Sequence, residues 1–189
     1  MDNAKGFILD HPDVRRMLLT MKSLTAAARA LCLDAALSLD LSKSNDKKEA
    51  NKENARASFL IPIAKAFSTD IGCRVADIGI QIHGGMGYVE ETGVAQILRD
   101  VRVTAIYEGT NGIQAIDLVG RKLSDSGKAA NDLIDEMKIT ISECNNNADQ
   151  HLKEMGNKLS KSLVCLETSL SWMLKQEDFN EKLAGATPF

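Results

Sequence analysis

The sequence contains few prolines and few aromatic residues. Only 3 of its 189 residues are proline and 4% are aromatic, whereas Ala, Leu, Lys and Glu are frequent. Because proline interrupts helices, and aromatic and β-branched residues favour strands, this composition favours helices. The hydrophobic share of 44% is sufficient to build a folded core, so the composition excludes global disorder.

The sequence also lacks an excess of one charge and any long apolar run. The net charge is -3, with 26% charged residues, which argues against a nucleic-acid-binding protein because such proteins present a strongly basic face. No apolar run reaches the length of about 20 residues that a membrane-spanning helix requires. The start, MDNAKGFILD, does not resemble a signal peptide. We therefore expect no nucleic-acid or membrane partner and a cytoplasmic location.

Clustered cysteines are absent as well. Cys32, Cys73, Cys144 and Cys165 lie far apart, with no CxxC pair and no Cys/His cluster of metal-binding spacing. Each lies on a segment that we predict to be helical. We therefore expect free, buried or half-buried thiols, a reducing environment and no metal site.

Apolar residues recur at helical spacing in two long segments, which predict two amphipathic helices. The first helix begins near Pro12, since proline is tolerated in a first turn. The polar stretch 42–54 is expected to be a loop or hairpin tip. Pro62 is expected in the first turn of the second helix, because a proline in a helix interior costs about 3 kcal/mol. Antiparallel packing of such helices predicts an all-α fold, an up-down helical bundle. The two stripes are Met17, Met21, Leu24, Ala28, Leu31 and Ala35, then Leu60, Ala64, Phe67, Ile71, Val75, Ile78 and Ile82.

The remaining sequence predicts shorter elements and a boundary. The glycines of HGGMGY end the second helix, Thr92 is a predicted N-cap, and 101–107 is a predicted loop. A helix is expected to begin near Thr110 or Asn111. After DSGK, at 125–128, two more helices follow, separated by the polar CNNNADQ. We predict a helical-bundle domain over 1–124 and a C-terminal helical extension over 125–189.

No residue establishes a site on its own. Gly84, Gly85 and Gly87 can bring a backbone close to phosphate oxygens, but they follow a helix rather than the strand of a dinucleotide-binding motif, so a helix end is the simpler interpretation. His83 has no partner for a catalytic triad or a metal. Glu108, in IYEGTNGIQ, is explained as a turn acid that interacts with the dipole of the following helix.

Taken together, however, three elements resemble a known family. The segment QIHGGMGYVEETGVAQILRDVRVTAIYEGTNGIQ, residues 81–114, combines Q-x-x-GG-x-GY, LRD and YEGT elements. In this order and spacing they resemble the C-terminal signature of the acyl-CoA dehydrogenase family. The resemblance extends back to about His11. HPDVRRMLLTMKSLTAAARAL and NGIQAIDLVGRKL are most similar to the branch of larger enzymes that includes methylmercaptopropionyl-CoA dehydrogenase, which carry an extra C-terminal helical region.

The resemblance implies an FAD-dependent enzyme that desaturates an acyl-CoA thioester between its α and β carbons. The glutamate of YEGT, here Glu108, would remove the α proton, and its backbone N–H would bind the thioester carbonyl. Tyr107 and Gly109 would line the acyl pocket. The family also forms dimers or tetramers through this domain, so a homo-oligomer is expected. Gly112 replaces a larger polar residue of many relatives, so a main-chain contact is expected there. The implied cofactor-binding residues are Gln81, Ile82, His83, Gly84 and Gly85, toward the ADP half of a neighbouring subunit's FAD, and Thr110, Asn111 and Gly112.

The N-terminal helical domain and middle β domain of the family have no counterpart in these 189 residues. We therefore expect a fragment, a truncated reading frame or one subunit of a split enzyme with a separately encoded N-terminal part. Such a chain alone is expected to show little or no activity and weak or no FAD binding. The alternative is a non-catalytic helical oligomerisation module. A DNA-repair homologue is disfavoured, because 124–189 mixes acidic and basic residues about evenly.

Overall fold

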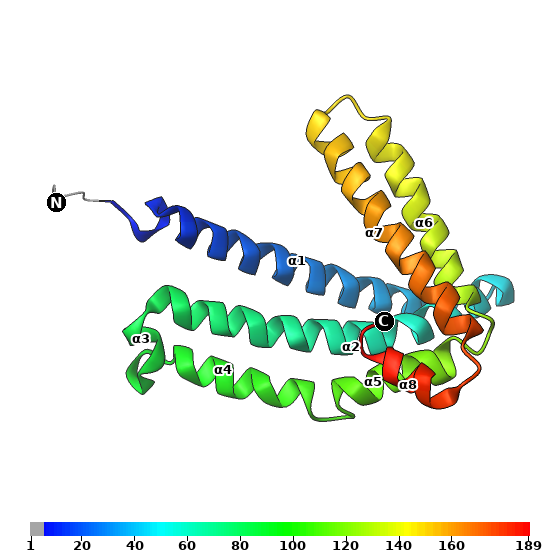
Figure 1. Cartoon of the computed structure of the whole chain (residues 1–189), viewed down its shortest axis with the longest axis horizontal. Helices are drawn as coiled ribbons and strands as arrows, with labels where there is room; N and C mark the ends of the chain where they lie inside the picture. The colour runs from blue at the N-terminus through cyan, green and yellow to red at the C-terminus, as the bar shows by residue number, and fades with distance from the viewer. Residues whose placement is uncertain (1–5) are drawn as a thin grey trace. The chain divides into compact units, whose positions relative to one another are not determined.

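The computed structural model describes residues 6–189, and within this range the chain is helical without a β-strand (Figure 1). The predicted all-α fold is confirmed; the first five residues of the predicted first domain lie outside the described residues. Short 3₁₀ turns cover Ile8–Asp10, Glu90–Thr92 and Val103–Ala105, and a π-helical turn, Leu118–Lys122, extends α5. The α-helices of the described range are α1 Pro12–Leu41, α2 Lys47–His83, α3 Gly85–Tyr88, α4 Val94–Arg102, α5 Asn111–Asp117, α6 Lys128–Asn145, α7 Gln150–Lys175 and α8 Phe179–Ala186.

The described chain divides into two compact units, and α2 contributes to both. The first unit contains the described residues up to Leu37 together with Ala64–Asn111. The second unit contains Ser38–Ile63 and Gly112–Phe189. Most of the predicted site residues therefore belong to the first unit, and Gly112 belongs to the second.

The first unit buries the apolar stripes that the sequence predicts. On α1, Met17 and Ala35 are buried and the rest of the stripe is half-buried. On α2, Ala64 and Ile71 are buried, whereas Phe67 is 38% exposed and does not belong to the core. The two helices are also joined by a polar contact, since Cys32 Sγ lies 3.3 Å from Ser68 Oγ.

The polar stretch 42–54 was predicted to be a loop or hairpin tip. This prediction is wrong for most of the stretch, because α2 begins at Lys47. The cause is a capping arrangement. Asp46 Oδ1 accepts a hydrogen bond from the backbone N–H of Lys48 at 2.8 Å, and the acidic Glu49 lies in the first helical turn. Ser44 Oγ donates to Glu49 Oε2 at 2.7 Å. The helix therefore begins about three turns before its first large apolar residue, Phe59.

Pro62 was predicted in a first turn but lies in the middle of α2. Its side chain is fully buried. Proline cannot donate to the carbonyl one turn earlier in the helix, that of Ser58, so one helical hydrogen bond is missing at this point. The division between the two units follows directly, after Ile63. A first-turn position was predicted because a proline in a helix interior costs free energy. Burial of the apolar proline ring offsets part of that cost.

Two predictions for the segment after α3 are also wrong. The N-cap position of α4 is Gly93, with φ 76°, and not Thr92. Thr92 Oγ1 instead donates to the carbonyl of Met86 at 2.6 Å, which closes the turn after α3. The predicted loop over 101–107 is helical through Ala105, because Val101 packs tightly against Gly72 of α2.

In the second unit, α6 and α7 form an antiparallel hairpin (Figure 1). Ile134 of α6 and Leu163 and Leu170 of α7 are buried. Gly156 permits a close approach near the hairpin tip, since a Cβ there would lie 2.7 Å from Asn145 Oδ1. Both helices were predicted, and α8 is an additional one. All four cysteines are free; Cys32 and Cys165 are exposed, contrary to the prediction of buried thiols.

Candidate functional site

Glu108 lies in a short turn between the 3₁₀ turn at Val103–Ala105 and α5. Its backbone φ is 52°, and that of Gly109 is 88°. Glu108 therefore adopts the left-handed conformation, which costs a non-glycine residue about 1–2 kcal/mol. Both Glu108 and Tyr107 are exposed. A non-glycine residue in this conformation persists only when the surrounding structure holds it.

Lys65 of α2 holds this turn. Its Nζ donates to the backbone carbonyl of Gly109 at 2.7 Å and to Oδ1 of Asn111 at 2.8 Å. Hydrogen bonds from a charged donor are stronger than neutral ones, about 1.5–3 kcal/mol each. They are therefore of sufficient size to offset the left-handed conformation of Glu108.

Asn111, the first residue of α5, uses its whole side-chain amide to bind α2. Its Nδ2 donates to Asp70 Oδ1 at 2.8 Å and lies 3.0 Å from Thr69 Oγ1. The single hydroxyl proton of Thr69 is then directed to the carbonyl of Lys65, 2.8 Å away. Both polar atoms of the side-chain amide, Oδ1 and Nδ2, already have protein partners. A contact from Asn111 to a cofactor would therefore be made by its backbone.

The second group of predicted residues surrounds the end of α2. The carbonyl of Gly79 lies 2.8 Å from His83 Nδ1 and accepts a hydrogen bond from it. A Cβ added at Gly84 or Gly85 would meet no atom within 4 Å, so the backbone is open there. Gly84 has φ 60° and ψ -143°, a conformation that essentially requires glycine. Gly87 differs, because a Cβ there would lie 2.5 Å from the carbonyl oxygen of Ile80.

The first unit thus places the predicted residues in two separate groups. Lys65 and His83 lie on one helix, 18 residues apart, which corresponds to roughly 27 Å at 1.5 Å per residue. Tyr107, Glu108, Gly109 and Asn111 lie at the Lys65 end. Gln81, Ile82, Gly84 and Gly85 lie at the His83 end, where Gln81 is exposed and Ile82 is half-buried. One chain therefore does not join both groups into a single pocket.

Lys65, Thr69 and Asp70 were not predicted from the sequence. Their partners lie 41 to 46 residues away in the chain, so no local pattern indicates the contacts. One signal was available. Lys65 directly follows Ala64 of the apolar stripe, and a half-buried cation beside such a stripe requires polar partners.

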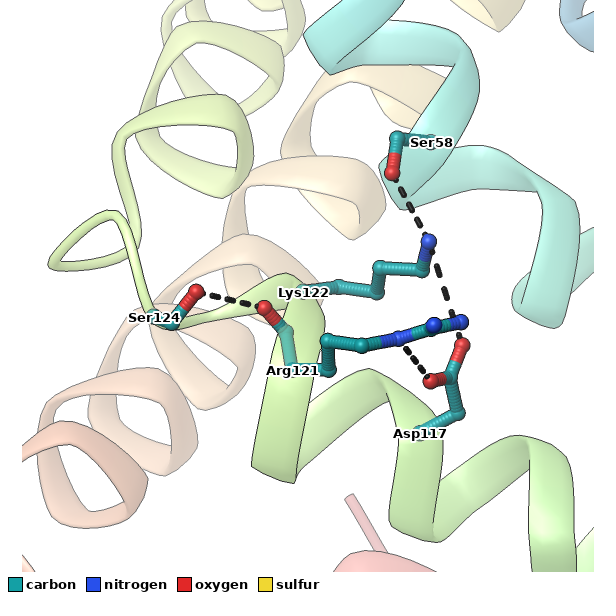
Figure 2. Close-up of polar contacts among 5 residues, drawn as sticks. All are labelled: Ser58, Asp117, Arg121, Lys122 and Ser124. Carbon is teal, nitrogen blue, oxygen red and sulfur yellow. Dashed lines mark hydrogen bonds and ion pairs between the residues drawn. The ribbon is translucent and has the colours of Figure 1, made fainter.

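A second polar cluster, in the second unit, joins the end of α5 to α2 (Figure 2). Asp117 accepts a hydrogen bond from Arg121 Nε at 2.6 Å, and Lys122 Nζ lies 3.9 Å from its other oxygen. Lys122 Nζ also donates to Ser58 Oγ at 2.8 Å. The hydrogen bond to Asp117, and then its negative charge, raise the pKa of Arg121. Both cations already have partners in the protein, so the cluster stabilises the π-helical turn.

A groove of about 860 Å³ also belongs to the second unit, between the first turns of α2 and α6. None of the predicted site residues lines it. At its wall Arg56 Nη1 donates to Glu136 Oε2 at 2.6 Å. Among residues 6–189 no group of three or more His, Cys, Asp or Glu side chains is placed to bind a metal ion. Within the same range no helix combines the length and apolar character needed to cross a membrane.

Comparison with solved structures gives the fold. A structure described as "Bd2924 apo-form" superposes with a TM-score of 0.67, covering 100% of this chain and 32% of that chain. The two sequences are 22% identical, so this similarity concerns the fold alone.

Sequence comparisons give the family. Residues 2–123 match the family model "Acyl-CoA dehydrogenase, C-terminal domain". The chain is 40% identical over 185 residues to 3-methylmercaptopropionyl-CoA dehydrogenase of Ruegeria pomeroyi, covering 96% of this chain and 31% of that protein. It is 40% identical over 119 residues to a butyryl-CoA dehydrogenase of Syntrophomonas wolfei, covering 62% of this chain and 19% of that protein. The chain thus spans a third or less of the length of these relatives, and it belongs to the acyl-CoA dehydrogenase family through the C-terminal domain of that family.

Proposed function

We propose that this chain is the C-terminal part of an FAD-dependent acyl-CoA dehydrogenase, which desaturates an acyl-CoA thioester between its α and β carbons. The observation that carries the proposal is the conformation of Glu108. A carboxylate in the YEGT element of this family is held in a left-handed turn by contacts to a neighbouring helix. Strained, tightly held residues of this kind concentrate at functional sites.

In the proposed reaction Glu108 accepts the α proton of the thioester substrate. Its backbone N–H donates to the thioester carbonyl, which acidifies that proton. Tyr107 and Gly109, on either side, line the acyl pocket, and the absence of a Cβ at Gly109 allows close approach. FAD, when bound, would supply the acceptor for the hydride that leaves the β carbon.

The residues proposed for the cofactor fit it in part. The open backbone at Gly84 and Gly85 suits close approach by the phosphates of a dinucleotide, next to Gln81, Ile82 and His83. Thr110, Asn111 and Gly112 are proposed to contact the cofactor from the other group, Asn111 through its main chain. Since the two groups lie at opposite ends of the α2 segment in the first unit, we assign the His83 group to the cofactor of a neighbouring copy.

We further propose that the chain alone has little or no activity and binds FAD weakly or not at all. A carboxylate that removes a carbon-bound proton needs a pocket that excludes water. Glu108 is exposed in this chain, so the cover must come from further polypeptide, whether part of a longer protein or a separately encoded N-terminal part. The assembly is proposed to be a homodimer or homotetramer. A cytoplasmic location, expected from the sequence, belongs to the same proposal.

The test is complementation. The purified chain is assayed for a flavin absorbance band and for acyl-CoA-dependent dye reduction, alone and together with the part of the Ruegeria relative that precedes the matched region. We expect no activity alone and activity in the mixture. Glu108→Gln should abolish that activity, since the amide keeps the shape but accepts no proton, whereas Glu91→Gln, an exposed control, should not.

Two results would contradict the proposal. A yellow, active chain without added polypeptide would overturn the inactivity of the isolated chain. Full activity of Glu108→Gln in the mixture would reject Glu108 as the base.

A second candidate function is a non-catalytic helical oligomerisation module. It is favoured by the exposed leucines of α1, Leu19, Leu33 and Leu37, which form an apolar face of the first unit. Activity in the complementation assay separates the two candidates, because the module would support none.

A further inference from the structure

We propose that Lys65 is the positioning residue of the Glu108 turn: its ammonium group, anchored on α2, fixes the left-handed conformation that presents Glu108. The inference rests on the proposed function for the role of Glu108 as a base. The contacts themselves stand without it.

The Glu108 turn requires a restraint. Glu108 and Gly109 are both left-handed, with φ of 52° and 88°. Glycine adopts this conformation freely, whereas glutamate does not. An unrestrained turn would therefore move Glu108 to another backbone region and would redirect its carboxylate and its N–H group together.

Lys65 restrains the turn through two hydrogen bonds. Lys65 Nζ donates to the carbonyl of Gly109, the residue next to Glu108, and to the side chain of Asn111, the first residue of α5. One ammonium group thus binds the turn and the helix that follows it. It acts from the part of α2 that follows Pro62, within the first unit, and the side chain is half-buried.

Lys65 is itself held by the side chain of Asn111. Asn111 Oδ1 accepts from Lys65, while its Nδ2 donates to Asp70 Oδ1. Thr69 lies one helical turn after Lys65, and its Oγ1 accepts a hydrogen bond from Asn111 Nδ2 at 3.0 Å. The Asn111 side chain therefore cannot rotate away without breaking several bonds, and the ammonium remains directed at the turn.

The position of the turn determines how the proposed base reaches its proton. A proton transfer depends steeply on geometry, and a displacement of about 1 Å can lower a rate by about 100-fold. The contacts of Lys65 Nζ are to the carbonyl of Gly109 and the side chain of Asn111. Its effect on the reaction passes through the backbone of Gly109, so it is a positioning residue and not a catalytic one.

The test uses solution NMR on the labelled chain, with the variants Lys65→Met and Lys65→Arg. The readouts are the coupling between the amide and α protons of Glu108, which reports φ, the carbonyl carbon shift of Gly109, and amide exchange over 106–111. We expect Lys65→Met to change the first two and to accelerate exchange at least about tenfold, since the charged donor is lost. Lys65→Arg should restore them in part, because its guanidinium can donate to both oxygens.

The matched control is Arg74→Met, which removes another cation from the same helix. Arg74 is exposed, and no side-chain hydrogen bond joins it to the described residues, so the three readouts should not change. Unchanged readouts in Lys65→Met would overturn the inference. Equal changes throughout α1 and α2 would also overturn it, because they would indicate a general loss of folding.

A measurement on the unmodified chain covers the case in which Lys65→Met fails to fold. A scalar coupling across the hydrogen bond, from Lys65 Nζ to the carbonyl carbon of Gly109, should be observable, and its absence would overturn the inference. None of these readouts needs a cofactor. Failure of the proposed function, seen as an active Glu108→Gln in complementation, is therefore distinguishable from failure of the Lys65 contact.

In the complemented assembly Lys65→Met should lower kcat roughly 10- to 100-fold with little change in KM, as expected for a misplaced base. An unchanged kcat would overturn the positioning role.

Discussion

At the scale of single residues, the glycines after α2 have different requirements although they are close in sequence. Gly85 is open on the side where a Cβ would lie, with no atom within 4 Å. At Gly87, the same atom would lie 2.5 Å from the carbonyl oxygen and 2.9 Å from the Cα of Ile80. Because backbone atoms of a helix cannot move aside as a flexible side chain can, Gly87 is fixed by packing. Gly85 is free to serve a ligand.

We therefore predict that Gly87→Ala lowers the free energy of unfolding by about 1–3 kcal/mol, as overpacking does in other cores. Gly85→Ala should leave it within about 1 kcal/mol of the original value, because the site is open and alanine restricts the unfolded chain. Urea unfolding followed by circular dichroism measures both. Equal destabilisation by the two variants would contradict the steric assignment.

At the scale of elements, the helices were predictable from apolar spacing, but two kinds of feature were not. The early start of α2 depends on the capping residue Asp46, whose signal is present in the sequence but was outweighed by the polar composition around it. The continuation of α2 through Pro62 depends on burial of the ring, which only tertiary packing supplies.

The candidate site shows the same division. The position of Glu108 before a helix was predictable, because YEGTN is a local pattern. Its left-handed backbone and its support by Lys65 were not, since the carbonyl that Lys65 binds is 44 residues away. Long-range contacts of this kind determine the geometry of the turn and leave no periodic signal in the sequence.

The α6–α7 hairpin yields a pH prediction. Lys138 of α6 lies 2.9 Å from Glu167 Oε1 of α7 and 3.2 Å from Asp135 Oδ1. The hydrogen bond to Glu167, and then that to Asp135, raise the pKa of Lys138 above its usual 10.5. A raised folded-state pKa means that this contribution to stability is complete below about pH 10.5 and is lost as pH rises through the folded-state pKa.

We accordingly expect Lys138→Gln to lower the urea midpoint by a small, constant amount between pH 7 and pH 9, and the difference from the original chain to shrink above about pH 10.5. The effect is small because the pair is exposed to solvent. Lys161→Gln on α7 is the control, since no ion pair joins Lys161 to a described residue. A difference that grows with pH would contradict the sign of the shift.

At the scale of the whole molecule, the question is what covers the outer face of α1. Leu19, Ala26, Ala30, Leu33 and Leu37 follow one another at intervals of seven, four, three and four residues, so they share one side of the helix. Met17 and Ala35, which are buried, lie on the opposite side. Leu19 and Leu33 are each 63% exposed and Leu37 is 57% exposed. A continuous apolar face of this kind is typical of an interaction surface.

The proposed homo-oligomer predicts that a second copy covers this face. Light scattering after size exclusion should give a mass above that of one chain, rising with concentration, since association is a mass-action equilibrium. The double variant Leu33→Gln, Leu37→Gln should shift the population toward the monomer at least tenfold, because it removes two exposed apolar side chains from the contact. Val164→Gln, which alters an equally exposed residue on α7, should not. A chain that stays monomeric at all concentrations would contradict self-association through α1, and it would leave the complementing polypeptide of the proposed enzyme as the occupant of that face.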